Sequence, residues 1–114
     1  MSEAEIQSQI MLALGSSRFC RAFRNNIGNA QTKDGRWIKF GVGYPGGGDL
    51  IGWRTVTITQ DMVGKPLAQF MSVEVKAPKG RIRPEQLNWA EVVKRAGGIA
   101  VVARSVDDVR FLVA

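Results

Sequence analysis

Apolar residues with helical spacing begin almost at the start of the chain. The residues that follow an i, i+4, i+7/8 stripe are Ile6, Ile10, Ala13 and Leu14. Ser2 and Glu5 stand three positions apart, which is the spacing of a capping box, and Gly15 can end the helix. We therefore expect a core-facing helix from Ser2 through Leu14.

A second helix is predicted in the C-terminal half of the chain. Pro84 suits the first helical position, and the glycine pair at 97–98 can terminate the segment. The apolar positions along one face are Leu87, Ala90 and Val93, with Trp89 and Ala96 beside them. Ser105 and Asp108 have the spacing of a cap for a final short helix through about Val113.

The strongest strand signal is LAQFMSVEVKA at 67–77, which Pro78 and Gly80 stop. The continuous apolar run at 99–104 is typical of a buried strand. Because a predicted helix lies between these two strands, we expect a parallel pair joined by a right-handed β-α-β crossover.

Weaker strand signals precede this unit. Short β-type runs are expected at 18–25, 49–53 and 55–59. Residues 25–36 read as a loop with an Asp34-Gly35 turn, and the glycine-rich stretch 37–48 is expected to be irregular. The predicted order is therefore α, several β, α, β, α.

Composition narrows the possible chemistry. The 114 residues suit one domain spanning 1–114, and 16 basic against 10 acidic residues give a net charge of +6. This surplus favours an anionic partner such as nucleic acid, although a merely soluble basic protein has the same charge. Histidine is absent and Cys20 is the one cysteine, which excludes Ser-His-Asp triads, His-ligated zinc and internal disulfides. A bound metal would need oxygen ligands, which points to Mg²⁺, Mn²⁺ or Ca²⁺.

The N-terminal segment and the lengths of the apolar runs bear on where the protein is located. The N-terminal segment lacks the layout of a signal peptide, and no apolar run reaches the ~20 residues that cross a bilayer. We expect a cytoplasmic protein without membrane contact.

Glu74 and Lys76 are two charged residues inside the strongest predicted strand. Alternating side chains place them on one face, roughly 7 Å apart along the strand, and place the neighbouring valines on the other face against the core. A solvated ion pair would give the same pattern. Asp49, which follows three glycines, could join Glu74 as a second metal ligand, or it could be an ordinary turn residue. In the first case the two carboxylates and the lysine are the groups that a metal-dependent phosphodiesterase needs. Lys76 would then contact the scissile phosphate or the attacking water.

The ordered set Asp49…Glu74-Val75-Lys76 resembles the PD-(D/E)XK nuclease superfamily, and its flanks resemble the VRR-NUC branch. That branch has a short glycine-rich stretch before the Asp, an E-V-K strand, a downstream Gln on a helix and a GG-x-A-x-V strand. The corresponding segments here are Gly46-Gly47-Gly48-Asp49, Glu74-Val75-Lys76, Gln86 and GGIAVV at 97–102. Residue 48 is glycine where the superfamily name implies proline.

The resemblance implies an α/β fold with a restriction-endonuclease-like core. Its central mixed β-sheet would be flanked by helices in the order α-β-β-β-α-β-α. It also implies Mg²⁺-dependent hydrolysis of DNA, with Mn²⁺ able to substitute, in a bacterial or phage-infected cell. Stand-alone members resemble Holliday-junction resolvases that act as homodimers in DNA repair, so branched DNA is the expected partner. The alternatives are a restriction-like or flap endonuclease of the same superfamily, and a basic DNA-binding module without cleavage.

The resemblance assigns roles to single residues as well. Asp49, Glu74 and the Val75 carbonyl are expected to hold the metal, and Glu5 to approach it through water. Glu5 could instead only cap its helix. Gln86 is expected to hydrogen-bond the water or the phosphate, and a surface glutamine is the competing interpretation.

A further set of side chains is expected to contact the DNA itself. These are Lys79, Arg81, Arg83, Tyr44 and Arg24. A simple basic loop would also explain the first three. The tryptophans Trp37, Trp53 and Trp89 are expected in the core.

Overall fold

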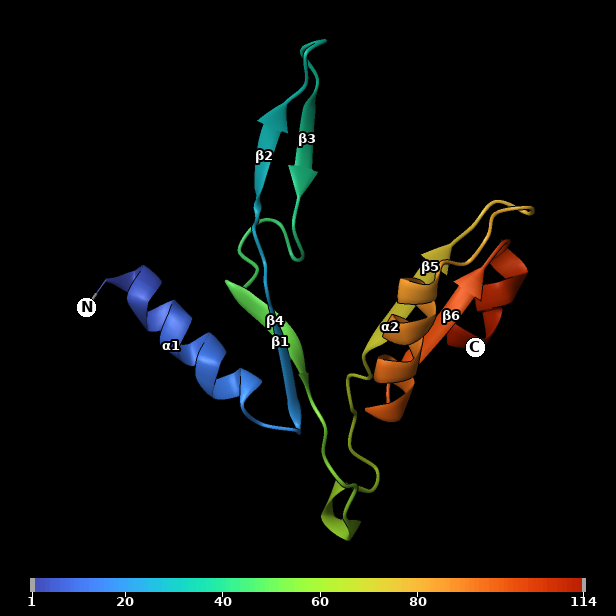
Figure 1. Ribbon diagram of the computed structural model, residues 1–114. Helices are drawn as coiled ribbons and strands as arrows, with labels where there is room; N and C mark the ends of the chain where they lie inside the picture. Colours follow the sequence, from blue (N-terminus) through green and yellow to red (C-terminus); the bar gives the residue numbers. More distant parts are fainter. Residues whose placement is uncertain (1, 114) are drawn as a thin grey trace. The chain divides into compact units, whose positions relative to one another are not determined.

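The computed structural model describes residues 2–113, which divide into two compact units after Val56 (Figure 1). Unit 1 contains α1 (Glu3–Gly15), β1 (Cys20–Arg24), β2 (Gly28–Gln31), β3 (Trp37–Phe40) and β4 (Leu50–Arg54). Unit 2 contains the 3₁₀ helix η1 (Gln60–Met62), β5 (Met71–Val75), α2 (Pro84–Arg95), β6 (Ile99–Ala103) and the 3₁₀ helix η2 (Val106–Val113). The protein therefore has a mixed α/β structure.

Helix α1 begins as its sequence predicts. The Glu5 N–H donates to Ser2 Oγ at 3.1 Å, and the Ser2 N–H donates to Glu5 Oε2 at 3.2 Å, which completes the capping box. The expected core-facing stripe is wrong, because no residue of α1 is buried and Ile6 and Ile10 are 43% and 45% exposed. Within unit 1 the helix contacts only β1, and a two-stranded ladder offers too little surface to cover an apolar stripe.

Strands β1 and β4 form an antiparallel ladder, in which Ala22 faces Gly52 and Arg24 faces Leu50. A Cβ at position 52 would lie 1.8 Å from the Arg21 carbonyl oxygen, so this close approach requires glycine. The strand expected at 49–53 is thus present as β4. The strand expected at 55–59 is wrong, because no strand is assigned to those residues.

Strands β2 and β3 form an antiparallel hairpin where we expected a loop and irregular structure. The turn is the predicted one, since the Gly35 N–H donates to the Thr32 carbonyl at 3.0 Å and Gly35 has φ +89°. A Cβ at Gly28 would lie 2.8 Å from the Phe40 ring, so this glycine makes room for the ring across the ladder. Glycines and amides conceal the strand periodicity here, which explains why the pattern was missed.

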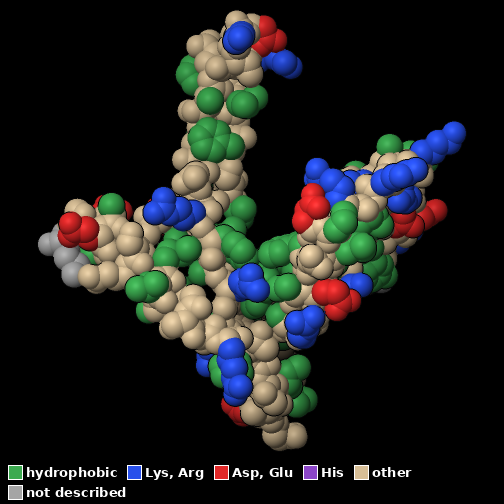
Figure 2. All heavy atoms as spheres, viewed as in Figure 1, with side chains coloured by type: hydrophobic (Ala, Val, Ile, Leu, Met, Phe, Trp, Pro, Cys, Tyr) green, Lys and Arg blue, Asp and Glu red, His purple; other side chains and the backbone are tan. Residues whose placement is uncertain are grey.

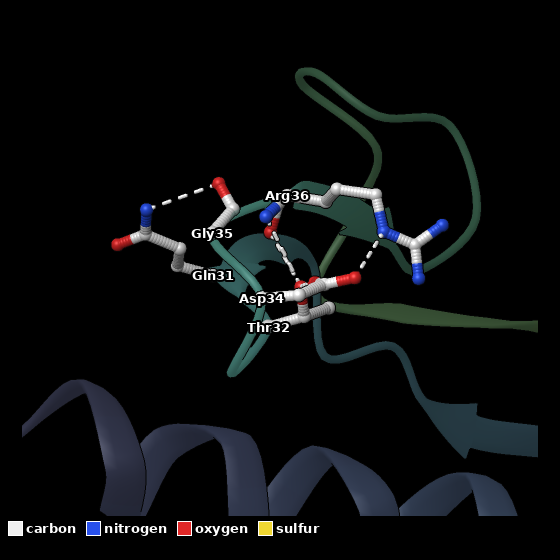
Figure 3. A network of polar contacts seen from close by, with 5 residues as sticks. All are labelled: Gln31, Thr32, Asp34, Gly35 and Arg36. Carbon is white, nitrogen blue, oxygen red and sulfur yellow. Dashed lines mark hydrogen bonds and ion pairs between the residues drawn. The ribbon is translucent and has the colours of Figure 1, made fainter.

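Polar contacts hold the tip of this hairpin (Figure 3). The Thr32 hydroxyl donates to the Asp34 carboxylate, and Arg36 Nε donates to Asp34 Oδ2 at 3.0 Å. The Arg36 N–H donates to Thr32 Oγ1 at 3.1 Å, and the Gln31 amide donates to the Gly35 carbonyl at 3.1 Å. The hydrogen bond from Thr32, followed by those from Arg36, lowers the pKa of the Asp34 carboxyl below its ordinary value.

In unit 2, β5 and β6 pair in parallel with Val73 beside Val101, and α2 connects them. This confirms the β-α-β arrangement. Helix α2 begins at Pro84 and is followed by Gly97 at φ +100°, as predicted. The buried apolar residues are Val93 of α2 and Ala103 of β6. The final helix is present as η2, although it is a 3₁₀ helix.

The apolar face of β5 is the more exposed one, whereas we expected it to be covered by the core. Ser72, Glu74 and Lys76 are half-buried, whereas Met71 and Val75 on the opposite face are 58% and 77% exposed. The expectation that the apolar set holds this strand on the core is therefore wrong within unit 2. The reason is that α2 covers the polar face, where the Trp89 indole N–H donates to Ser72 Oγ at 2.9 Å.

The described strands form three two-stranded sheets, β1-β4, β2-β3 and β5-β6. The mixed α/β character is as expected, whereas the exact order of a restriction-endonuclease-like core stays a prediction, because the β2–β3 hairpin is added and no strand forms at 55–59. The single central mixed sheet of a restriction-endonuclease-like core stays a prediction. Trp37 is 66% exposed, so its expected place in the core is wrong. Among residues 2–113, no helix combines the length and the apolar character that crossing a membrane requires.

Replacing Thr32 by valine tests the polar network at the hairpin tip. A lowered pKa means that folding favours the ionised Asp34, so this stabilisation is present above the ordinary value of 3.8 and is lost as the pH falls through the lowered pKa. In Thr32→Val the pKa of Asp34 should rise towards its ordinary value, as measured by ¹³C NMR titration of the carboxyl. The exposed Thr57→Val variant serves as the control and should leave the Asp34 titration unchanged.

Candidate active site

Glu74 and Lys76 lie on the same face of the strand region, as the alternation of side chains predicted. Lys76 Nζ is 3.6 Å from Glu74 Oε1. The Lys76 side chain is 16% exposed and that of Glu74 is 40% exposed, so the lysine side chain is the less exposed of the two. A largely covered lysine beside a carboxylate that still reaches solvent is an arrangement that can place positive charge next to an anionic ligand.

Gln86 links this pair to helix α2. Its amide nitrogen donates to Glu74 Oε1, and its amide oxygen accepts from the Arg83 N–H at 2.9 Å. Only one orientation of the amide satisfies both partners, because the backbone N–H can only donate and the carboxylate accepts. Gln86 is thus half-buried and hydrogen-bonded at both ends of its amide, and its expected contact with the water or the phosphate stays a prediction. In this structure Gln86 fixes the orientation of Glu74.

A cavity of about 240 Å³ opens between the polar face of β5 and helix α2. Its polar lining includes Ser72, Glu74 and Gln86, and Glu85 and Lys94 lie at α2. The remaining lining residues are Ile82, Leu87, Trp89, Ala90, Ala100, Val101 and Val102. Glu74 thus faces a recess, as the sequence led us to expect, and not a flat surface.

The carbonyl of Val75 lies on the edge of β5 that faces away from β6. The Lys76 N–H donates to the Ala103 carbonyl at 3.0 Å, so the backbone groups of Lys76 point towards β6. Because backbone groups alternate between the two edges of a strand, those of Val75 point to the other edge. Among the described residues no strand pairs along that edge, which suits a carbonyl proposed as a ligand.

The basic segment after β5 is anchored by a residue that the sequence reading did not single out. Arg104 Nη1 donates to the carbonyls of Ala77 at 2.7 Å and Pro78 at 3.2 Å. Lys79 and Arg81, which follow in the same segment, are exposed. The third basic residue of the set, Arg83, is also exposed, as the residue preceding α2. The bonds from Arg104 thus hold the backbone that presents these cations.

In unit 1 the stretch before Asp49 is held by Asn25, a buried residue that sequence reasoning missed. Its amide nitrogen donates to the carbonyls of Val42 at 2.8 Å and Gly48 at 3.0 Å, and its amide oxygen accepts from the Val42 N–H at 2.8 Å. Its own N–H donates to the Asp49 carbonyl at 2.9 Å. The Asn25 side chain therefore closes the glycine-rich loop, and its backbone N–H holds the residue before β4. Hydrophobic periodicity does not mark such a residue, because its role depends only on its hydrogen-bond partners.

Gly47 explains part of the glycine content of this loop. A Cβ at this position would lie 2.1 Å from the Val42 carbonyl oxygen, so no other residue fits without a change in the backbone. The Gly47 N–H donates to the Gly43 carbonyl at 2.8 Å, which adds a tight turn. Asp49 itself is exposed at the end of this loop, directly before β4.

The other candidate site residues of unit 1 are Glu5, Arg24 and Tyr44, and each has different contacts. The Glu5 carboxylate takes part in the capping box of α1, and its proposed approach to a metal stays a prediction. Arg24 is exposed at the end of β1, opposite Leu50. Tyr44 is half-buried, with its hydroxyl accepting from the Asn29 amide at 3.1 Å and Lys39 Nζ 5.3 Å from its ring centroid.

The donor chemistry suits a hard cation, because the candidate ligands are carboxylate and carbonyl oxygens. Within residues 2–113, no group of three or more His, Cys, Asp and Glu side chains gathers closely enough to hold a metal ion. Glu5 and Asp49 belong to unit 1, and Glu74 with Val75 belongs to unit 2. The arrangement within unit 2 therefore supplies one carboxylate, one carbonyl and one amine.

The chain matches the model of a known protein family. A family model described as the VRR-NUC domain matches residues 6–107 of the chain. The chain belongs to the VRR-NUC domain family. This VRR-NUC domain is thus a nuclease domain, for which DNA is the indicated substrate. Comparisons with curated proteins and with solved structures gave no match.

The match covers every residue proposed for the site of this VRR-NUC domain except Glu5, which lies just before it. The resemblance drawn from Asp49, the Glu74-Val75-Lys76 strand and Gln86 is therefore confirmed at the level of the family. The roles of the single residues remain predictions. The anchoring residues Asn25 and Arg104 come from the structure alone.

Replacing Asn25 by alanine tests how the loop before Asp49 is held. The change removes three part-buried hydrogen bonds to the backbone of Val42 and Gly48, each of which contributes about 0.5–1.5 kcal/mol to stability. We expect a lower midpoint in denaturant unfolding and faster hydrogen exchange at the Val42 N–H. The adjacent exposed residue supplies the control, and Asn26→Ala should change both quantities little. Equal effects of the two variants would contradict the role given to Asn25.

Proposed function

We propose that this protein is a metal-dependent, structure-specific DNA endonuclease that acts on branched DNA in the manner of a Holliday-junction resolvase. The observation that carries the proposal is the contact of Glu74 with both the Lys76 ammonium at 3.6 Å and the Gln86 amide, beside a cavity. A carboxylate oriented from two sides and an enclosed amine are the groups that phosphodiester hydrolysis needs. Membership of the VRR-NUC family supports the nuclease part of this proposal.

The side chains divide the work as follows. Gln86 holds the Glu74 carboxylate in one orientation, and Lys76 places a positive charge beside it. In our proposal Lys76 orients the attacking water and stabilises the charge that develops on the scissile phosphate. Its low exposure strengthens that interaction, because a charge is screened less where water is excluded.

Asp49, Glu74 and the Val75 carbonyl would hold Mg²⁺ or Mn²⁺, with Glu5 contributing through water. When bound, the ion supplies Lewis-acid charge at the scissile phosphate. The glycine-rich loop and Asn25 set the backbone position from which Asp49 projects. The edge of β5 that faces away from β6 presents the Val75 carbonyl.

Cations of both units would bind the DNA backbone. In unit 2 these are Lys79, Arg81 and Arg83, presented on the segment that Arg104 anchors. In unit 1 they are joined by Arg24, and Tyr44 would contact a sugar or base. The net charge of +6 supports binding to a polyanion, and such binding should weaken as salt concentration rises.

A homodimer is part of the proposal. Two active sites related by a two-fold axis would each meet one strand of a junction with the same symmetry. The exposed apolar side chains on β5, with Val75 at 77%, support a further protein contact at that strand. Unlike a purely DNA-binding module, such an enzyme must depend on a divalent ion.

Charge-matched substitutions test the active site. Lys76→Ala should lower the rate of DNA cleavage in Mg²⁺ by about 10²–10³-fold, because it removes one preorganised group that stabilises the transition state. Glu74→Gln should abolish cleavage, since it removes a metal ligand and leaves an amide in its place. Both variants should still bind DNA in chelator, as measured by fluorescence anisotropy.

The controls for these variants carry the same change of charge elsewhere in unit 2. Lys65→Ala and Glu91→Gln alter exposed residues that line neither the cavity nor the Glu74 cluster. Their cleavage rates should stay within about twofold of the unmodified protein, as for surface sites in general. A Lys76→Ala variant that cleaves at the same rate would contradict the role given to Lys76. An unmodified protein that binds DNA but cleaves none in Mg²⁺ would be only a DNA-binding module.

A panel of substrates tests the preference for branched DNA. We expect four-way junctions to be cut faster than flaps and linear duplexes of the same length, with Mg²⁺ or Mn²⁺ and not with chelator. Sedimentation velocity should give the mass of a dimer under the same conditions. Faster cutting of flaps or linear duplexes would replace the resolvase with a flap or restriction-like endonuclease.

A further inference from the structure

The β2–β3 hairpin presents two faces with different chemistry. Because cross-strand partners share a face, the residues on one side are Asn29, Gln31, Trp37 and Lys39, which we call the Trp37 face. The residues on the other side are Gly28, Ala30, Ile38 and Phe40, which we call the Ile38 face. The first face combines an indole, an amine and two amides, whereas the second is apolar.

The aromatic character of the Trp37 face extends beyond the two strands. Lys39 Nζ lies 5.3 Å from the centroid of the Tyr44 ring, and the Asn29 amide donates to the Tyr44 hydroxyl at 3.1 Å. Two contacts from the hairpin thus hold the Tyr44 ring beside this face. The result is a stripe in which a cation stands among aromatic rings and amides.

Trp37 is 66% exposed, and within the described residues of unit 1 no helix or other strand contacts the hairpin. In Figure 2 hydrophobic side chains lie open along the hairpin, and charged side chains gather at its tip. A large exposed aromatic residue on a surface with no cover marks an interaction site. The width of a two-stranded ribbon is also one that the major groove of DNA admits.

The charges around Trp37 favour a polyanion as the partner. Lys33, Arg36 and Lys39 are basic, and the one acidic residue of the hairpin, Asp34, is already bonded to Thr32 and Arg36. Aromatic rings interleaved with cations are the combination that binds exposed bases and phosphates together. A protein partner would be better served by the apolar Ile38 face.

We propose that the Trp37 face is a DNA-binding surface, on which Trp37 stacks against an unpaired base at a branch point and Lys39 contacts the phosphates. The inference rests on the proposed function in taking DNA as the ligand, and it adds the part of the chain that distinguishes branched from linear DNA. The hydrogen bonds of the hairpin tip, drawn in Figure 3, hold the ribbon in shape before it binds.

The test measures DNA binding by fluorescence anisotropy in chelator, with a splayed fork and a fully paired duplex of equal length. Trp37→Ala should weaken binding to the fork by about tenfold, which is the order of one lost base–aromatic stack, and should leave duplex binding within about twofold. Trp37→Phe should keep most of the affinity for the fork, because a ring remains. Lys39→Ala should reduce the slope of log affinity against log salt by about one.

Ile38→Ala is the matched control, since Ile38 is 51% exposed at the neighbouring position on the opposite face. Its affinity for both DNAs should equal that of the unmodified protein. The inference is overturned if Trp37→Ala binds the fork normally, or if Ile38→Ala weakens binding as much. It is also overturned if Trp37→Ala changes only the sedimentation coefficient, because the face would then serve a second copy of the chain.

Cleavage separates this inference from the proposed function. A protein that cuts DNA in Mg²⁺ while Trp37→Ala binds normally would keep the nuclease and lose the Trp37 face. A protein that cuts no DNA, but loses affinity for the fork in Trp37→Ala, would keep the Trp37 face and lose the nuclease.

Discussion

The carboxylate of Glu74 is a point at which strand β5 and helix α2 meet through polar groups, beside the hydrogen bond from Trp89 to Ser72. It lies 3.6 Å from the Lys76 ammonium and accepts a hydrogen bond from Gln86, whose other end receives the Arg83 N–H. An apolar contact could hold the strand and the helix equally well, but it could not orient a carboxylate. The face of β5 that α2 covers is therefore the polar one, and Met71, Val73 and Val75 lie on the exposed side.

The same principle operates in unit 1 with a different side chain. The Asn25 side chain does what a neighbouring strand would do, because its amide forms hydrogen bonds with the backbone of both Val42 and Gly48. A loop rich in glycine has high conformational entropy when unfolded, so it needs such a fixed point to hold one shape. Asp49 follows this loop directly, so the hydrogen bonds of Asn25 to Gly48 and Asp49 set the position of its backbone.

The groups proposed for the function of this nuclease domain lie on segments that are far apart in the chain. The acid and amine of unit 2 are placed by a parallel β-α-β unit, whereas the hairpin of unit 1 provides an exposed indole among cations. Rigid local elements carry each of these groups. Arg104 and the network around Asp34 each hold the backbone of a basic segment through hydrogen bonds.

The sequence by itself determined the capped helix α1, the start and end of α2, the parallel strands around it and the family. These features depend on local spacing, which a single chain displays. It also predicted that Glu74 and Lys76 share a face, because side chains alternate along any strand. The hairpin β2–β3 escaped prediction, since glycines and amides conceal its periodicity.

Only the tertiary structure decided which face of β5 is covered, that Trp37 is exposed, and that Asn25, Gln86 and Arg104 fix their neighbours. Burial and hydrogen-bond partners depend on contacts between residues that are 12 to 27 positions apart in the chain. No local pattern records such contacts, because a residue's spacing to its neighbours is the same whether or not a distant segment packs on it.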